Sequence, residues 1–334
     1  MSKIKPGKGS PYARILGVGG YRPVRVVPND VILETIDSSD EWIRSRSGIA
    51  TRHWASPQET VAAMSVEASG KALAAAGIAP EKIDAVIVST VSHFKQTPAV
   101  ATEIAHRVGA GKPAAFDISA GCAGFGYGLT LAKGLVVEGS AEYVLVIGVE
   151  RLSDLTDLED RATAFLFGDG AGAVVVGPSD EPAIGPTVWG SEGDKSETIK
   201  QTVPWDEYRS TDSAEKFPAI TQEGQAVFRW AVFEMAKVAQ QALDAAGITA
   251  DDLDVFIPHQ ANMRIIDSMV KTLKLPEHVT VARDVETTGN TSAASIPLAM
   301  ERLLATGAAK SGDTALVIGF GAGLVYAATV VTLP

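Results

Sequence analysis

The sequence contains an internal repeat, and this repeat restricts the possible folds more than any other feature. Residues 72–78 read ALAAAGI and residues 242–248 read ALDAAGI, an offset of 170. Further along, YVLVIGV at 143–149 matches TALVIGF at 314–320 at an offset of 171. Two matches in the same order at nearly the same offset indicate an internal duplication of roughly 170 residues. The 334-residue chain is therefore expected to consist of two similar halves.

Each half carries the pattern of helices that alternate with buried strands. The first repeated segment is in both cases a helix that ends at a glycine, Gly77 or Gly247, and an apolar strand such as 84–90 (DAVIVST) follows after an acidic turn. This alternation predicts an α/β fold with largely parallel central strands. We place the halves at residues 1–180 and 181–334. A duplicated α/β chain tends to have its active site between the halves, at the carboxyl ends of strands.

Two segments lie outside this pattern. Residues 191–220 are polar and poorly periodic, and we interpret them as a long excursion that forms a pocket wall. The first ten residues are predicted to be a loose tail without the apolar core of a signal peptide. Because no later apolar stretch reaches membrane-spanning length, we expect a cytoplasmic protein that does not bind a membrane.

The charge and the cysteine content argue against several classes of function. The chain has 29 Lys and Arg against 40 Asp and Glu, and its net charge of −11 argues against binding to nucleic acid or anionic lipid. Cys122 is the single cysteine, which excludes an intrachain disulfide and a multi-thiolate metal site. The five histidines show no metal-ligand spacing such as HExxH, so we expect no metal ion.

The segment around Cys122 has the features of a nucleophile. It reads AFDISAGCAGFGYGLTLAKGL (115–135), in which a strand is followed by small residues and then by an apolar helix. A thiol at a helix N-terminus faces the positive end of the helix dipole, which lowers its pKa. The neighbouring Gly121 and Gly124 leave room for an acyl group. The alternative is a small buried hydrophobic residue, which is the commoner role of a lone cytosolic cysteine.

Two polar residues of the second half, His259 and Asn290, are further candidates. His259 follows an apolar strand in FIPHQANMRIID (256–267) and is predicted to open a helix, which places it at the expected edge of the site. Asn290 stands in TTGNTSAAS (287–295), ahead of small residues that open another helix. Taken alone, the histidine is more often a structural residue, and the asparagine segment is a helix cap, with Asn290, Thr291 or Ser292 as the capping residue.

Three glycine-rich runs do not indicate a dinucleotide cofactor. The runs GVGG (17–20), GDGAG (168–172) and GFGAG (319–323) lack the strand–turn–helix context that the nucleotide-binding fingerprint requires. We therefore expect no nicotinamide and no other cofactor.

Taken together, these segments resemble the β-ketoacyl-acyl-carrier-protein synthases III, the initiating condensing enzymes of bacterial type II fatty-acid synthesis. The resemblance covers essentially the whole chain and rests on AGCAGF (120–125), PHQAN with RIID (258–267), GNTSAAS (289–295) and GFGAG (319–323). It implies a thiolase-like fold, a duplicated five-layered α/β/α/β/α sandwich, usually in a homodimer. It also implies that an acyl-CoA starter condenses with malonyl-acyl carrier protein, with loss of CO₂, to give a 3-oxoacyl product.

The resemblance implies a role for each residue of the catalytic centre. Cys122 would be the acylated nucleophile, and His259 and Asn290 would complete the triad and stabilise an enolate by hydrogen bonds. The backbone N–H groups of Cys122 and Ala322 would form the oxyanion hole. Phe320 matches the aromatic residue that stands beside the cysteine and favours decarboxylation.

The resemblance also implies two binding surfaces. Contacts to the substrate and to CoA are assigned to Trp42, Arg46, Arg161, Asn262, Phe228, Phe320 and Thr97. Docking of the acidic acyl carrier protein is assigned to Arg229, Arg264, Lys271 and Lys274, of which the last three would share one helix. Thr97 aligns with a gate that the partner subunit contributes, and it is smaller than the phenylalanine of some family members. It predicts a pocket that accepts branched starters such as isobutyryl-CoA as well as acetyl-CoA.

Related condensing enzymes differ in their triads. Elongating ketosynthases use Cys–His–His and thiolases need a second cysteine, and neither pattern fits this chain. Chalcone-synthase-like enzymes share the triad but are typically longer. A starter-unit ketosynthase of an aromatic polyketide pathway has the same fold, triad and CoA chemistry, and the motifs barely separate it from the first interpretation. A non-catalytic binding subunit would be expected to lose Cys122, His259 or Asn290, all of which are present.

Overall fold

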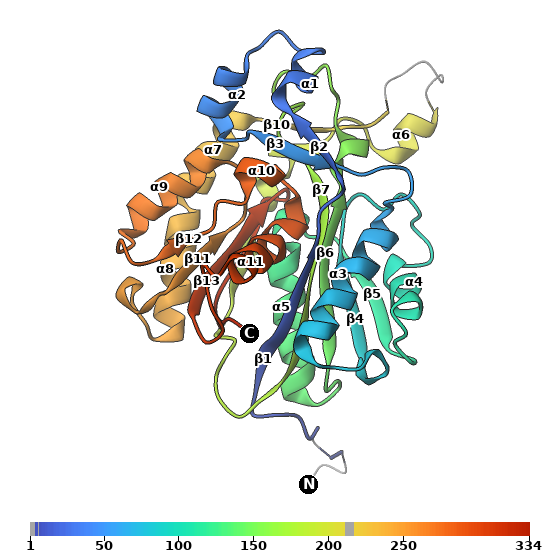
Figure 1. The fold of residues 1–334 in the computed structure, drawn as a ribbon, viewed down its shortest axis with the longest axis vertical. Helices are drawn as coiled ribbons and strands as arrows, with labels where there is room; N and C mark the ends of the chain where they lie inside the picture. The colour runs from blue at the N-terminus through green and yellow to red at the C-terminus, as the bar shows by residue number, and fades with distance from the viewer. Residues whose placement is uncertain (1–3, 6, 211–216) are drawn as a thin grey trace.

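The computed structural model describes residues 4–5, 7–210 and 217–334 and contains two five-stranded sheets (Figure 1). The first has the order β1 (Tyr12–Tyr21), β7 (Asp169–Ser179), β6 (Val144–Arg151), β4 (Ala85–Ser89) and β5 (Ala114–Ile118). The second has the order β8 (Val188–Ser191), β14 (Val325–Thr332), β13 (Thr314–Gly321), β11 (Val255–Pro258) and β12 (Thr280–Val281). The strands of the first sheet precede residue 180 and those of the second sheet follow it.

The two sheets are related by the internal repeat. In both orders given above, the first two strand pairs are antiparallel and the other two are parallel. Two long helices, α5 (Gly124–Glu138) and α11 (Ser295–Thr306), begin 171 residues apart. Each follows a short 3-10 turn, η2 (Gly121–Ala123) or η6 (Ser292–Ala294). The predicted duplication is therefore confirmed.

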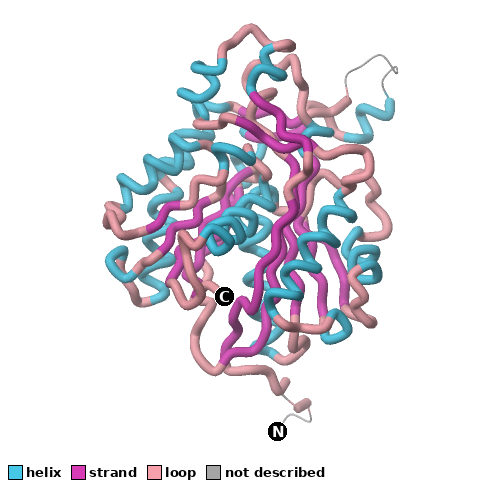
Figure 2. Tube along the Cα trace, in the orientation of Figure 1, coloured by secondary structure: helices cyan, strands magenta, loops and turns pink. Residues whose placement is uncertain are grey.

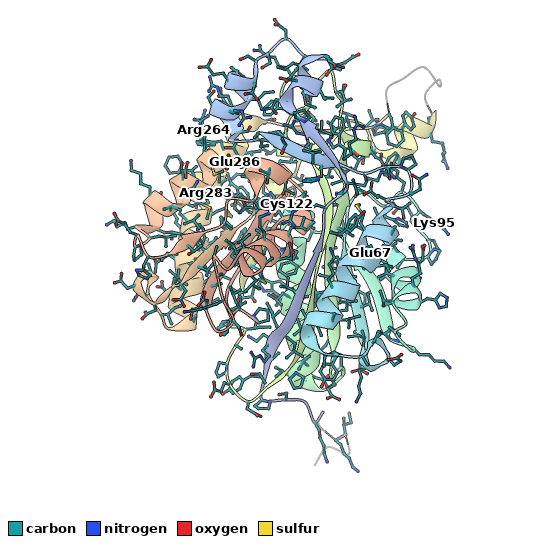
Figure 3. All side chains as sticks on the ribbon, in the orientation of Figure 1. Glu67, Lys95, Cys122, Arg264, Arg283 and Glu286 are labelled. Atoms are coloured by element: carbon teal, nitrogen blue, oxygen red, sulfur yellow. The ribbon has the colours of Figure 1, made fainter. Side chains whose placement is uncertain are left out.

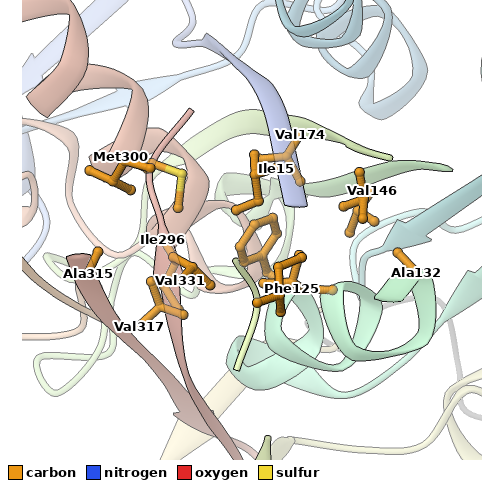
Figure 4. Packing of buried hydrophobic residues seen from close by; sticks show 14 of the residues in the cluster. Ile15, Phe125, Ala132, Val146, Val174, Ile296, Met300, Ala315, Val317 and Val331 are labelled. Atoms are coloured by element: carbon orange, nitrogen blue, oxygen red, sulfur yellow. The ribbon is translucent and has the colours of Figure 1, made fainter. Parts of the chain in front are cut away.

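The elements stack in five layers, with strands enclosed by helices (Figure 2). α5 and α11 lie between the sheets, where Phe125, Ala132, Ile296 and Met300 pack with the inward-facing residues of both sheets (Figure 4). The outer helices are α3 (Val61–Ala76) and α4 (Val100–Arg107) on the first sheet, and α8 (Met235–Ala246) and α9 (Met263–Leu273) on the second. The thiolase-like sandwich is therefore confirmed.

Successive side chains of a central strand point to opposite faces of the sheet and pack in different layers. Val255 and Ile257 of β11 pack in the central core, whereas Phe256 between them packs with the outer helices. In the same way, Val146 of β6 faces the centre and Leu145 faces outward. Because both faces are covered, the central strands are apolar throughout. Complete burial of one such side chain contributes about 1.5–3 kcal/mol.

A smaller layer stands at the end of the molecule where the central strands finish (Figure 1). Its elements are β2 (Arg25–Pro28), β3 (Thr51–Trp54), α1 (Asn29–Leu33), α2 (Asp40–Ser47) and α10 (Val285–Thr288). The buried Arg52 joins them, since its guanidinium donates to the Val27 carbonyl at 3.2 Å, the Phe165 carbonyl at 2.9 Å and Asn29 Oδ1 at 2.6 Å. The layer has its own apolar cluster and forms a roof above the sheets.

The described part of the segment 191–220, which leaves out residues 211–216, is more regular than its polar sequence suggests. Its elements are η4 (Gly193–Thr198), β9 (Ile199–Gln201), α6 (Trp205–Ser210) and β10 (Ile220–Gln222), and α7 (Gly224–Phe233) follows. β9 and β10 pair antiparallel as a separate two-stranded sheet. Residues of both strands line the cavity that also contains Cys122, so the predicted role of this segment as a pocket wall is confirmed.

The expectation of a loose N-terminal tail is wrong for residues 7–10, which pack against the end of α5. The Ser10 N–H donates to the Val136 carbonyl at 3.3 Å, and a Cβ at Gly9 would lie 2.1 Å from the Val137 carbonyl oxygen. This long-range contact has no local sequence signal. Residues 1–3 and 6 of the expected tail lie outside the described residues. Among the residues that are described, no helix is long and apolar enough to cross a membrane.

Candidate active site

Cys122 stands in the turn that joins β5 to α5. It lies in η2, and α5 begins two residues later at Gly124, so its predicted place at a helix N-terminus is confirmed. Glycine is required at two positions around Cys122, because other atoms lie where a side chain would begin. A Cβ at Gly124 would lie 1.8 Å from the Ser89 hydroxyl oxygen, and a Cβ at Gly321 would lie 2.8 Å from the Cys122 sulfur. The ends of β4 and β13 are therefore in direct contact with the cysteine turn.

Burial decides the protonation state of the thiol. Loss of hydration raises the pKa of Cys122 to about 12, a hydrogen bond with Ser292 acts in the opposite direction, and the negative charge of Glu150 raises the pKa further. The expectation of a lowered thiol pKa is therefore wrong for this structure, because desolvation raises the pKa of Cys122. The Cys122 thiol is protonated at neutral pH, and it has to lose its proton when it attacks.

His259 directly follows β11 and is 2% exposed. Its Nδ1 lies 2.7 Å from the Ser295 hydroxyl, which also accepts the Gln260 N–H at 3.3 Å. The Ser295 hydroxyl can donate its proton to Nδ1 while it accepts from Gln260, and in that arrangement Nε2 is the protonated nitrogen. Desolvation lowers the pKa of His259 to about 3, so the ring is neutral. One detail of the prediction is wrong: α9 begins at Met263, with Asn262 as its N-cap.

Asn290 is fixed by its backbone and by its side-chain oxygen. Its N–H donates to the Leu166 carbonyl at 2.9 Å, and its carbonyl accepts the Gly168 N–H at 2.9 Å. Its Oδ1 accepts the Ser292 N–H at 2.8 Å, which fixes the side chain just ahead of η6, whose N-cap is Thr291 rather than Asn290. Within the described residues, its Nδ2 makes no hydrogen bond to protein and remains available as a donor.

Cys122, His259 and Asn290 line one cavity of about 210 Å³. Its walls come from both halves of the chain and are mainly apolar, with Leu155, Phe167, Ile199, Ile220, Trp230 and Ile265 among them. Figure 3 shows Cys122 near the middle of the molecule, away from its outer edges. In the described part of the chain, no group of three or more His, Cys, Asp and Glu residues is placed to hold a metal ion.

The turn between β13 and β14 completes the cavity beside the cysteine. Phe320 is 2% exposed, and its ring packs edge-on against His259 with 5.4 Å between the centroids and 81° between the planes. The imidazole is thus held by this ring and by the hydrogen bond of its Nδ1. A Cβ at Gly121 would lie 3.4 Å from the Ala322 nitrogen, which places the Ala322 backbone beside the cysteine turn.

Trp42, Arg46 and Arg161 come together at one side of the roof layer. The guanidinium carbon of Arg161 lies 5.1 Å from the centroid of the Trp42 ring, and that of Arg46 lies 5.9 Å from it. Phe165 packs edge-on against the same ring at 5.5 Å. A flat ring beside two guanidinium groups suits a ligand with an aromatic base and phosphates.

The other assigned substrate contacts differ in their surroundings. Asn262 uses its side chain within the protein, since Oδ1 accepts the Arg264 N–H at 2.9 Å and Nδ2 donates to the Arg46 carbonyl at 3.0 Å. Phe228 lies 5.0 Å from the Arg264 guanidinium carbon. Thr97 is exposed and is not among the described residues of this chain that line the cavity. Its assignment to a gate therefore depends on a second subunit.

The assigned docking residues form a surface on two helices. Three of them are exposed on α7 and α9: Arg229, Arg264 and Lys271. The expectation that Lys274 shares their helix is wrong, because it is the C-cap of α9 and has a left-handed φ of 50°. Asp267 also lies on α9, where it pairs with Arg283 at 2.8 Å, so the surface is not uniformly basic.

Three buried polar residues near the triad were not predicted. Glu150, near the end of β6, is fully buried, and desolvation raises its pKa to about 7. Ser292 and Ser295 belong to the GNTSAAS motif, where Ser292 had been considered only as a possible helix cap and Ser295 only as a small residue. A signal was present for Glu150, since a charged residue at the carboxyl end of an α/β strand stands at the expected site edge.

Comparison with known proteins gives the same family over the whole chain. The models described as 3-oxoacyl-[acyl-carrier-protein (ACP)] synthase III and its C-terminal part match residues 116–193 and 243–333. The curated β-ketoacyl-[acyl-carrier-protein] synthase III 1 of Streptomyces coelicolor is 86% identical over 343 residues, and the match covers 100% of both chains. The mycobacterial β-ketoacyl-[acyl-carrier-protein] synthase III of Mycobacterium marinum is 54% identical and covers 100% of this chain and 99% of its own.

Solved structures agree with the sequence relatives. The priming β-ketosynthase from the R1128 polyketide biosynthetic pathway is 48% identical with a TM-score of 0.97, covering 100% of this chain and 99% of its own. The 3-oxoacyl-[acyl-carrier-protein] synthase III of Aquifex aeolicus is 38% identical with a TM-score of 0.87, covering 96% and 99%. The chain belongs to the β-ketoacyl-acyl-carrier-protein synthase III family.

Proposed function

We propose that this protein condenses an acyl-CoA starter with malonyl-acyl carrier protein to give 3-oxoacyl-acyl carrier protein and CO₂, and so initiates fatty-acid synthesis. The observation that carries the proposal is that the only thiol of the chain, Cys122, lines one cavity together with His259 and Asn290. The relatives that are 83–86% identical are named β-ketoacyl-[acyl-carrier-protein] synthases III.

In the first half-reaction the Cys122 sulfur attacks the thioester carbonyl, and CoA leaves. Negative charge develops on the carbonyl oxygen, and the backbone N–H groups of Cys122 and Ala322 are the donors that stabilise it. One such donor typically lowers the barrier by about 3 kcal/mol. The apolar walls at Leu155 and Phe167 then accommodate the short acyl chain.

In the second half-reaction the malonyl group loses CO₂ and becomes an enolate. His259 donates a hydrogen bond to the enolate oxygen from Nε2, in the neutral tautomer whose Nδ1 accepts the Ser295 proton. Asn290 donates from Nδ2. The apolar ring of Phe320 disfavours the charged malonyl carboxylate and therefore favours its loss. The enolate carbon attacks the acyl group on Cys122, and the cysteine leaves as a thiolate.

Two surfaces deliver the substrates in this scheme. Trp42 and Arg161 bind the adenine end of CoA, and the ring–guanidinium geometry between them supports this role. The exposed Arg229, Arg264 and Lys271 attract the acidic carrier protein. We further infer a cytoplasmic homodimer in which Thr97 of each subunit reaches the neighbouring pocket. None of the steps requires a metal ion, a redox cofactor, nucleic acid or a membrane.

A priming ketosynthase of an aromatic polyketide pathway is the second candidate function. The observation in its favour is the likeness to the R1128 priming β-ketosynthase, with 48% identity and a TM-score of 0.97. The two functions share their chemistry and differ in the carrier protein that receives the starter. The identities of 83–86% to β-ketoacyl-[acyl-carrier-protein] synthases III favour the first.

The test supplies the pure protein with acetyl-CoA or isobutyryl-CoA and with malonate on a fatty-acid or a polyketide carrier protein. We expect acyl mass on the Cys122 peptide, 3-oxoacyl product on the fatty-acid carrier, and turnover of both starters. Product on the polyketide carrier alone would select the second function. Acylation by acetyl-CoA but not by isobutyryl-CoA would contradict the branched-starter prediction. The Cys122→Ala variant serves as the blank for acylation. If the wild type is not acylated above this blank, the proposed function is contradicted.

A further inference from the structure

The glutamine of the PHQAN motif (258–262) has a buried amide whose polar groups all have partners within the protein. Gln260 is 1% exposed. Its Nε2 donates to the Pro258 carbonyl at 2.7 Å and to the Ala282 carbonyl at 3.2 Å, and its Oε1 accepts the Val285 N–H at 3.1 Å. Both N–H donors of the amide and its acceptor oxygen are therefore used inside the protein, and the side chain connects three segments.

Gln260 takes the place of a side-chain cap for α10. The first N–H groups of a helix have no partner inside the helix, and the side chain of the preceding residue commonly accepts one of them. In α10 the preceding residue, Asp284, makes no such hydrogen bond, and its carboxylate pairs instead with Arg22 at 3.2 Å and with Arg302 at 2.6 Å. The Gln260 oxygen, 25 residues earlier in the chain, accepts the Val285 N–H. α10 is thereby fastened to the turn that follows β11.

A second connection joins the same turn to the far end of the segment 285–295, which carries Asn290. The Ser295 hydroxyl lies 2.7 Å from Nδ1 of His259 and accepts the Gln260 N–H at 3.3 Å. The turn that carries His259 thus holds this segment at both its first and its last residue. Within the described residues, the side chains of His259 and Asn290 share no hydrogen bond of their own. Their spacing therefore depends on these two connections.

The other anchors of Asn290 lead to a different part of the molecule. Its backbone N–H and carbonyl form hydrogen bonds with Leu166 and Gly168, which directly precede β7 of the first sheet. These bonds fix Asn290 relative to the first half of the chain. Gln260, in contrast, relates the segment of Asn290 to β11, the strand of the second sheet that His259 follows.

We propose that Gln260 is a positioning residue that sets the spacing of the two donors to the enolate oxygen, His259 Nε2 and Asn290 Nδ2. The inference rests on the proposed function, in which both donors act on that oxygen when the malonyl group loses CO₂. A displacement of about 1 Å in a catalytic site can lower the rate by about 100-fold. Acylation uses other donors, the N–H groups of Cys122 and Ala322, and the partners of Gln260 lie in neither of those two turns. It should therefore not depend on Gln260.

The decisive variant is Gln260→Met, which keeps the length of the side chain and removes its three hydrogen bonds. Two rates are measured separately: release of CO₂ from malonyl-acyl carrier protein, and acylation of Cys122 by acetyl-N-acetylcysteamine, which lacks the adenine end of CoA. We expect decarboxylation to fall by roughly 10- to 100-fold. Acylation should stay the same. Gln260→Asn keeps an amide but is one methylene too short to join β11 to α10, so it should show the same difference between the two rates, and it replaces Gln260→Met if that variant does not fold.

The matched control is Asn29→Leu in the roof layer. Asn29 is another amide that is 1% exposed, and its Nδ2 donates to Asp40 Oδ1 at 2.7 Å and to the Ile49 carbonyl at 3.0 Å. Its Oδ1 accepts from Arg52 at 2.6 Å. The variant thus loses the same number of hydrogen bonds of a buried amide, away from His259 and Asn290. It should keep the wild-type ratio of decarboxylation to acylation.

A second readout separates positioning from general damage to the site. In an Asn290→Ala background only one donor is left to position, so Gln260→Met should lower decarboxylation far less than it does in the wild type. Equal factors in the two backgrounds, or equal losses of decarboxylation and acylation, would overturn the positioning role and make Gln260 a structural residue. Wild-type decarboxylation in Gln260→Met would overturn it as well. If the wild type is neither acylated nor releases CO₂, the proposed function itself fails.

Discussion

The imidazole Nδ1 of His259 lies 2.7 Å from the hydroxyl of Ser295, the first residue of the central helix α11. The relationship joins the end of a strand in the second sheet to the helix layer between the sheets. In the first half the corresponding contact is the close approach of Ser89, at the end of β4, to Gly124 at the start of α5. The duplicated fold thus provides the same strand-to-helix junction twice, and only the second junction carries a histidine.

Replacing Ser295 with alanine should impair condensation more than acylation. The variant leaves Nδ1 without its partner in a buried site, which costs about 1–3 kcal/mol, and it no longer favours the tautomer protonated on Nε2. We expect malonyl decarboxylation to fall by roughly 10- to 100-fold, in line with that energy. Rates of malonyl-acyl carrier protein decarboxylation and of Cys122 acylation, measured separately, check this prediction. Equal losses in both steps would contradict it.

The buried His259 should contribute a loss of stability in mild acid that a variant without the imidazole lacks. Its pKa falls from 6.5 to about 3 on folding, so the unfolded chain binds more protons below pH 6.5, and stability decreases as pH falls from there toward 3. Linkage predicts a loss of about 2 kcal/mol between pH 7.5 and 5.0 from this group. Urea unfolding at both pH values should show wild type losing about 2 kcal/mol more than His259→Gln, because buried carboxyls with a raised pKa such as Glu150 act in the opposite direction in both proteins. The same pH dependence in both proteins would contradict the prediction.

A methyl group at Gly124 should be far more harmful than one at Gly134 on the same helix. A Cβ at Gly124 would lie 1.8 Å from the Ser89 oxygen, whereas a Cβ at Gly134 would meet nothing within 4 Å. We expect Gly124→Ala to lose several kcal/mol or to fail to fold. Gly134→Ala should gain about 0.5–1 kcal/mol from helix propensity. Thermal melts of both variants, and of Gly124→Ala with Ser89→Ala for partial rescue, provide the measurement.

The sequence predicted those parts of the site that depend on local order along the chain. The repeat indicated two sheets, and the strand-to-helix positions of Cys122 and His259 followed from apolar runs and small residues. Glu150 and Ser292 were missed because β6 belongs to the first half of the chain and η6 to the second. The hydrophobic pattern of a sequence does not show which strand end will lie beside which turn. The prediction of a lowered pKa for the Cys122 thiol was wrong for a related reason. The extent of desolvation depends on how both halves pack around the thiol, and the local sequence does not show this packing.

Trp42→Ala should weaken the use of acyl-CoA without affecting a truncated thioester. The ring lies against the guanidinium of Arg161 in the roof layer and is not among the described residues that line the catalytic cavity. If it binds the adenine end of CoA, its loss should raise KM for acetyl-CoA by roughly 10-fold or more. Acetyl-N-acetylcysteamine lacks that end, so its kcat/KM should stay the same. A loss with both substrates would indicate damage to the cavity instead.

Reversal of charge on α9 should separate binding of the carrier protein from chemistry. The whole protein has a net charge of −11, so an acidic partner is repelled except where basic side chains gather locally. Lys271 and Arg264 are exposed on α9, whereas Lys95 is exposed on the opposite side of the molecule from Arg264 (Figure 3). This arrangement supplies a matched control of equal charge.

For Lys271→Glu we expect KM for malonyl-acyl carrier protein to rise by roughly 3- to 10-fold, because the change replaces an attraction at the rim of the interface with a repulsion. The rate at saturation and the acylation by acyl-CoA should not change, since the residue lies outside the cavity lining of the described chain. The difference from wild type should shrink in 0.5 M salt, where the screening length falls to a few ångströms. Lys95→Glu should behave as wild type. If both variants raise KM equally, the effect belongs to net charge, and the docking surface on α9 is contradicted.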